Sequence, residues 1–176
     1  PSEMIDQIYQ IGKDIGERIS NVVVMGTGEP LDNYDNLLRF IELLTDENGI
    51  NISQRNLTVS TCGLVPRMRQ LADEKLSITL ALSLHASNQE KRKALMPVAN
   101  SYDIHDVVDA CKYYFAQTGR RVTFEYSLVG GVNDTAEDAT AFGTRAWHEL
   151  PYKSDSGKPD KGARLRAVQQ GCYRGF

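Results

Sequence analysis

Residues 21–33 read NVVVMGTGEPLDN and hold the clearest structural signal in the chain. Four apolar residues, Val22–Met25, predict a short strand buried on both faces, as in a parallel sheet. Gly26 and Gly28 follow, so the backbone can turn sharply and a ligand can approach closely. Glu29 then places a carboxylate at the carboxyl end of the strand, where α/β folds bind ligands. A carboxylate beside exposed backbone suits a ligand that bears an ammonium group.

The spacing of the glycines separates this stretch from two common phosphate-binding motifs. GTGEP matches neither the dinucleotide fingerprint GxGxxG nor the phosphate loop GxxxxGK[ST]. An ordinary strand-to-helix turn with a solvated Glu29 remains an alternative for the stretch taken alone.

Size and composition indicate one globular domain. The 176 residues are 41% hydrophobic and 24% charged, which is ordinary for a globular protein with a real core. No apolar run approaches the length of a membrane span, and no secretory leader is visible, so we expect no membrane association. Three cysteines are too few and too scattered for a disulfide framework, and we expect a cytoplasmic location.

Charge is spread unevenly along the chain. Residues 141–176 hold seven Lys/Arg and three Asp/Glu, a net charge of +4, whereas the whole chain has −3 and residues 1–140 therefore −7. An acidic body argues against this piece gripping nucleic acid alone, because phosphate contacts need Lys and Arg.

Hydrophobic periodicity predicts strands that alternate with helices, and therefore a parallel sheet with outer helices. Helices are expected over residues 2–19, 33–44, 64–72 and 104–118, with a further one from Thr135, and strands over 22–25, 56–60, 76–83 and 121–129. The polar stretch 87–100 is left without an element. The strands lead into GTGE, STCG, SLHA and VGGVND, which would share one ligand site at the carboxyl ends.

These segments resemble a known family. MGTGEPLDNYDN, LTVSTCGLVP, LALSLHA, KALMPVAN and RRVTFEYSLVGGVNDT are similar, in that order, to the radical S-adenosylmethionine (SAM) methyltransferases that modify ribosomal RNA. The resemblance extends from about residue 3 to about residue 138. It implies a partial radical SAM (β/α) barrel and methyl transfer from SAM to C2 of an adenine in 23S rRNA, and often in tRNA.

The resemblance also implies which residues bind SAM. They are Gly28, Glu29, Ser60, Ser83, Leu84 and His85. Ammonium, carboxylate and ribose hydroxyls make SAM a ligand for such polar groups. Ser60 as a helix cap and His85 as a satisfied core histidine are the alternatives. We interpret Glu125 as a charged residue at the barrel mouth with a structural role.

Two features of the family are missing from this sequence. Its [4Fe-4S] cluster is held by three cysteines in CxxxCxxC, which this chain lacks, so we assign no metal ligand. Its methyl-carrying cysteine lies near the C-terminus in a context that Cys172 does not match, so we assign no catalytic residue. Cys62 is expected to be a small buried thiol beside the pocket, and Cys111 a packing residue.

The tail departs from the family. Permitted codons for the residues from Leu150 onward, read one nucleotide later, encode Cys-His-Ile-Asn-Leu-Ile-Pro-Val-Asn-Pro, the family strand expected there. We therefore predict a change of reading frame near residues 138–142, with a core fragment over 1–140 and an aberrant or disordered tail over 141–176. Trp147, His148 and Cys172 would then carry no function. A genuine divergent tail is the alternative.

The sequence thus predicts a fragment of an RNA methyltransferase that carries part of the SAM pocket and is inactive alone. The alternatives are a non-catalytic SAM-binding or interaction module, another radical SAM enzyme such as an adenine-C8 methyltransferase, and, third, an open α/β nucleotide-binding domain. The oligomeric state is not predicted.

Overall fold

The computed structural model describes residues 1–148, with side chains to residue 144. Its four strands form one parallel sheet in the order β1-β2-β3-β4. The strands are β1 (Val22–Val24), β2 (Leu57–Thr61), β3 (Thr79–Ser83) and β4 (Val122–Glu125). The α-helices are α1 (Ser2–Ile15), α2 (Tyr34–Thr45), α3 (Val65–Asp73), α4 (Gln89–Leu95), α5 (Ile104–Thr118) and α6 (Ala136–His148). Short 3-10 turns cover Pro30–Asn33, Gln54–Asn56 and Pro97–Asn100. This is the predicted α/β architecture of parallel strands and outer helices.

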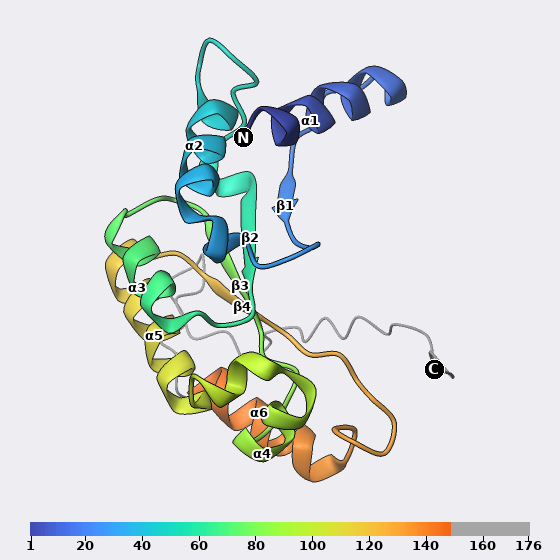
Figure 1. The fold of residues 1–176 in the computed structure, drawn as a ribbon, viewed down its shortest axis with the longest axis vertical. Helices are drawn as coiled ribbons and strands as arrows, with labels where there is room; N and C mark the ends of the chain where they lie inside the picture. Colours follow the sequence, from blue (N-terminus) through green and yellow to red (C-terminus); the bar gives the residue numbers. More distant parts are fainter. Residues whose placement is uncertain (149–176) are drawn as a thin grey trace.

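The two faces of the sheet differ in chemistry. Leu57, Val59, Leu80 and Leu82 point to one face, and all four are fully buried in the core that α2, α3 and α5 complete. Figure 1 shows these helices together on one side of the sheet. Because side chains alternate along a strand and register partners share a face, the other face carries small or polar groups. On β2, β3 and β4 they are Thr58, Ser60, Thr79, Ala81, Ser83, Thr123 and Glu125.

Strand β1 corrects one expectation from the sequence. Val23 is 57% exposed and Met25 is 53% exposed, so the strand is not buried on both faces. The reason is its place at the edge of the sheet, where Val22 and Val24 turn towards the core and Val23 points away from it. An unbroken apolar run therefore does not distinguish an edge strand from a central one.

Helix ends follow local capping chemistry. Helix α5 has the predicted bounds, with Asp103 accepting a hydrogen bond from the His105 amide at its start and Gly119 at a φ of 64° at its end. Helix α1 ends at residue 15, earlier than expected, because Gly16 takes up the left-handed conformation.

The region left without an element in fact holds α4. Asn88 caps this helix by accepting a hydrogen bond from the Lys91 amide at 2.9 Å. Helices α4 and α6 lie beyond the carboxyl ends of the strands, as Figure 1 shows. Asp138 of α6, which is buried, accepts hydrogen bonds from Lys91 Nζ at 2.6 and 2.8 Å and from the Ser87 hydroxyl. This network ties the two helices together.

The predicted boundary at residue 140 falls within α6, which begins after Thr135 as expected. Phe142, the last buried residue of that helix in the described part, packs edge-on against Tyr126 with ring centroids 4.7 Å apart. Most of the segment assigned to an aberrant tail, residues 149–176, lies outside the described residues, as does Cys172.

Candidate functional site

The carboxyl ends of the four strands gather the polar groups that the sequence analysis singled out. Glu29 follows β1, Cys62 follows β2, His85 follows β3 and Glu125 closes β4. Parallel pairing places all four ends along one edge of the sheet. Together the four ends contribute two carboxylates, a thiol and an imidazole.

Glu29 is held by two backbone amides from different parts of the chain. Its Oε1 accepts a hydrogen bond from Leu31 N at 3.0 Å, and its Oε2 accepts one from Cys62 N at 2.7 Å. Gly28, at a φ of 105°, supplies the left-handed backbone that turns the chain into this position. Among the residues described, no cationic side chain pairs with Glu29 within 4.0 Å. The carboxylate is therefore fixed in direction, with lone pairs and charge left for a ligand.

Ser60 and Ser83 meet on the polar face through Glu125. The hydroxyl of Ser83 donates to Glu125 Oε2 at 2.7 Å, and the hydroxyl of Ser60 donates to the same oxygen at 3.1 Å. Ser83 and Glu125 are register partners on neighbouring strands, whereas Ser60 lies one strand further away on β2. Ala81 stands between them with a side chain small enough to let the carboxylate reach across.

Leu84 and His85 are anchored to the end of β4 by their backbones. Both amides donate to the Glu125 carbonyl, at 3.1 and 3.2 Å. His85 has a φ of 55°, and its Nδ1 accepts a hydrogen bond from Ser127 N at 3.1 Å. Burial lowers the pKa of its imidazole, so the ring is neutral near pH 7. With Nδ1 acting as an acceptor, the proton resides on Nε2, which makes that atom a donor.

Asn133 secures the loop that brings Ser127 to this histidine. Its amide nitrogen donates to the carbonyls of His85 and Ser127, and its Oδ1 accepts from Val129 N at 2.7 Å. The predicted strand 121–129 ends at Glu125 because the following residues use their backbone groups in this loop.

Arg92 contacts Cys62, the residue whose amide donates a hydrogen bond to Glu29. The guanidinium of Arg92 is fully buried and donates from Nη2 to the Cys62 carbonyl at 2.6 Å, while its Nε and Nη1 have no partner in the described part of the chain. Burial lowers the pKa of Arg92 and raises the pKa of the Cys62 thiol to about 12, with Glu29 adding to the second effect. Cys62 is therefore a protonated thiol and not a nucleophile at neutral pH.

The arrangement suits an organic ligand with donor groups better than a metal. Within residues 1–144, no group of three or more His, Cys, Asp or Glu side chains could hold a metal ion. Two carboxylates without cationic partners suit ammonium and hydroxyl groups, and neutral His85 adds a donor. Cys111, as expected, is a packing residue within α5, fully buried in the core.

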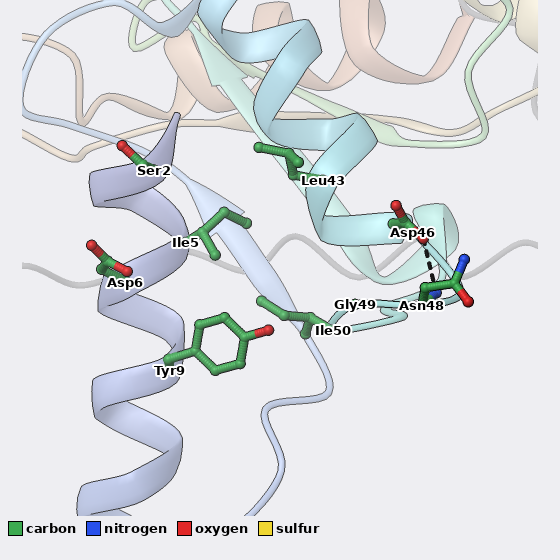
Figure 2. Close-up of a pocket in the computed structure, with 9 residues that line it drawn as sticks. All are labelled: Ser2, Ile5, Asp6, Tyr9, Leu43, Asp46, Asn48, Gly49 and Ile50. Atoms are coloured by element: carbon green, nitrogen blue, oxygen red, sulfur yellow. Dashed lines mark hydrogen bonds between the residues drawn. The ribbon is translucent and has the colours of Figure 1, made fainter.

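A separate hollow of about 290 Å³ lies between α1 and the end of α2, at the opposite edge of the sheet (Figure 2). It is lined by Ser2, Ile5, Asp6, Tyr9, Leu43, Asp46, Asn48, Gly49 and Ile50. Figure 2 shows one hydrogen bond among these residues, from Asn48 N to Asp46 Oδ1 at 2.8 Å. None of the site residues predicted from the sequence lines this hollow, so we place the site at the strand ends.

The structure thus brings four of the six sequence-predicted residues together, around Glu125. They are Ser60, Ser83, Leu84 and His85. Gly28 and Glu29 are connected to them through Cys62, which follows Ser60 by two residues. The sequence analysis placed Glu125 at the barrel mouth but did not predict its contacts with Ser60 and Ser83, and it missed Arg92 entirely. Glu125, the last residue of a strand on its polar face, carried a usable signal, whereas Arg92, in an apparently featureless polar stretch, carried none.

The fold is an α/β part-barrel, and the chain belongs to the radical SAM superfamily, whose family model matches residues 2–142. The chain is 67% identical over 139 residues to a probable dual-specificity RNA methyltransferase RlmN of Lachnospira eligens, covering 79% of this chain and 40% of the relative. A protein of the same name from Lachnoclostridium phytofermentans is 64% identical, with 77% and 38% covered.

A solved structure agrees with this assignment. A radical SAM methyltransferase from Sphaerobacter thermophilus superposes with a TM-score of 0.74 at 42% identity, over 77% of this chain and 40% of that one. The resemblance to radical SAM methyltransferases and the partial-barrel architecture are therefore confirmed. The chain spans about two fifths of the length of the relatives it matches. Among the residues described, no helix is both long and apolar enough to span a membrane.

Proposed function

We propose that this chain carries part of the SAM site of an RNA methyltransferase that modifies C2 of an adenine in 23S rRNA, and also tRNA. The observation that supports this most is Glu29, whose carboxylate two backbone amides fix at the strand ends while no described cation neutralises it. The relatives are named dual-specificity RNA methyltransferases, which supports RNA as the substrate and two kinds of RNA as targets. The reaction would take place in the cytoplasm, where both RNAs are found.

Each residue of the site has a distinct part in binding SAM. Glu29 accepts a hydrogen bond from the ammonium of the methionyl group. Gly28 has no Cβ, so the ligand can approach the backbone closely at this residue. Ser60 and Ser83 present oxygen atoms to donor groups of the ligand, such as ribose hydroxyls. Leu84 supplies apolar contact and backbone groups, and His85 donates from Nε2. When bound, SAM supplies the methyl group for transfer.

The described residues do not fit the [4Fe-4S] cluster that the superfamily uses. No step through a cluster is assigned to this chain. The alternative from the sequence, a non-catalytic SAM-binding module, would bind SAM in the same place without transferring its methyl group.

A segment exchange tests the proposed function. Residues 2–140 of this chain would replace the matching segment of the Lachnospira eligens relative, in cells whose own enzyme has been deleted, and nucleosides from 23S rRNA and tRNA would be measured by mass spectrometry. We expect 2-methyladenosine in both RNAs. The unmodified relative serves as the positive control. Formation of 8-methyladenosine would instead support a C8 methyltransferase, and a folded chimera that leaves adenine unmethylated would contradict the proposal.

A further inference from the structure

One carboxylate oxygen organises two of the proposed SAM-contacting side chains. Glu125 Oε2 accepts hydrogen bonds from both Ser60 and Ser83, which belong to different strands. A carboxylate has no proton to offer at neutral pH, so in both contacts the serine must be the donor. Each hydroxyl has a single proton, and both protons are therefore committed to Glu125.

This commitment determines what the two serines can offer to a ligand. A serine hydroxyl has one donor and two acceptor positions, and once the donor is used only lone pairs remain. Ser60 is 6% exposed and Ser83 is half-buried, so water has little access to reorient the first hydroxyl. Hydrogen bonds to an ionised acceptor are shorter and stronger than neutral ones, which holds the orientation before the ligand arrives.

The geometry points to Glu125 as a positioning residue for SAM, one that turns the hydroxyls of Ser60 and Ser83 into a preorganised pair of acceptors for the ligand's donor groups. This inference rests on the proposed function, because it takes SAM as the ligand. The Glu125 carbonyl meanwhile accepts the amides of Leu84 and His85. Glu125 thus contacts four of the six residues assigned to the site, two by its side chain and two by its backbone.

Charge gives Glu125 a second effect in the same direction. Neither Glu125 nor Glu29 has a cationic partner within 4.0 Å in the described part of the chain. SAM carries a sulfonium and an ammonium, and two uncompensated carboxylates at one sheet edge create a field that favours such a ligand over a neutral analogue. Glu125→Gln would therefore disturb both the orientation of the serines and this field.

A double-mutant cycle on SAM affinity tests the inference, with isothermal titration calorimetry on the full chain. Four proteins are compared: wild type, Glu125→Gln, Ser60→Ala/Ser83→Ala, and the combined variant. We expect Glu125→Gln to weaken binding about tenfold, because a neutral amide oxygen accepts the two serine protons more weakly than a carboxylate oxygen does, and the amide nitrogen adds donors of its own. In the background without serine hydroxyls, the same substitution should cost less than about threefold.

Matched controls separate positioning from charge and from folding. Glu90→Gln removes one negative charge at an exposed position of α4 and should leave SAM affinity unchanged. Thermal unfolding of each variant reports stability independently of binding. Should Glu125→Gln fail to fold, Glu125→Asp takes its place. The shorter aspartate side chain should lose the longer of the two hydrogen bonds, the one to Ser60. Glu125→Asp should therefore weaken SAM binding in the wild-type background, and weaken it much less in a protein that already carries Ser60→Ala.

Two results would overturn the inference, and they differ from each other. In the first, the combined variant loses SAM affinity by the product of the factors lost in Glu125→Gln and in the serine double variant. Glu125 would then act independently of the serines, so the positioning role would be wrong while SAM binding by the chain would stand. If folded wild-type protein does not bind SAM, the proposed function itself fails and this inference with it.

Discussion

Substitution of Arg92 by methionine is predicted to weaken SAM binding while leaving the stability of the fold nearly unchanged. The Arg92 guanidinium is fully buried, and only one of its nitrogens has a hydrogen-bond partner among the residues described, the Cys62 carbonyl at 2.6 Å. Keeping an unpaired cation inside a protein costs several kcal/mol. A contribution to stability therefore does not explain Arg92. Its hydrogen bond connects it to the site instead, because it anchors Cys62, whose amide donates to Glu29.

We expect Arg92→Met to change the free energy of unfolding by less than about 2 kcal/mol. Methionine fills much of the same volume and removes the buried charge, a gain of several kcal/mol at most, whereas the Cys62 carbonyl loses its donor, a cost of about 1–3 kcal/mol. SAM affinity should nevertheless fall about tenfold, since the residue that fixes Glu29 is no longer anchored. Arg92→Ala should instead destabilise the protein by about 2–5 kcal/mol, because it leaves a cavity.

Urea unfolding gives the stability of each variant and calorimetry gives its SAM affinity. Arg55→Met, at an exposed position, is the matched control and should change neither quantity. Destabilisation of the Arg92→Met fold by more than about 4 kcal/mol, with a folded fraction that binds SAM as wild type does, would contradict this prediction. Arg92 would then be a structural residue without influence on the site.

Three further predictions concern the fold, the metal and the gene. Hydrogen bonds from Lys91 and Ser87 hold the pKa of Asp138 well below its usual range, so its contribution to stability is present above the unfolded pKa of about 3.9 and is lost as the pH falls further. Thermal unfolding between pH 6 and pH 2 should show this loss, and Asp138→Asn should be less stable at pH 6 but much less sensitive to acid; equal acid sensitivity would contradict the assignment. Reconstitution of the chain with iron and sulfide should give no stable [4Fe-4S] absorbance and no RNA methylation, and a stable cluster spectrum would refute this. Sequencing of the source DNA should reveal a one-nucleotide shift near codon 140, whereas a homologous expressed gene that encodes residues 141–176 in one uninterrupted frame would rule it out.

Local signals were sufficient for most of the fold. Asp103 and Gly119 mark both ends of α5 in the sequence, and the alternation of strands with helices fixed the parallel sheet. Helix α4 was missed because its seven residues are too few to show a periodic apolar face, and its Asn88 cap resembles any polar loop residue. The exposure of Val23 depends on which strand forms the edge, which is a tertiary property.

The sequence indicated which residues lie at the strand ends, but not the hydrogen bonds that connect them. Gly28 and Glu29 follow directly from a strand, so their place at its carboxyl end could be inferred from local sequence. The contact between Glu125 and Ser60 joins residues 65 positions apart across an intervening strand, and the one between Arg92 and Cys62 joins residues 30 apart. Only the register of the strands and the packing of α4 determine these pairs.

Titration of the full chain with SAM, comparing wild type with Glu29→Gln, tests the central claim most directly. A hydrogen bond from an ammonium to a carboxylate contributes about 1.5–3 kcal/mol, so we predict that wild type binds one SAM and that Glu29→Gln binds it about 10- to 150-fold more weakly. Glu47→Gln, an exposed substitution with the same change of charge, should bind as wild type does. Equal affinities of wild type and Glu29→Gln, or no binding by folded wild-type protein, would contradict the account.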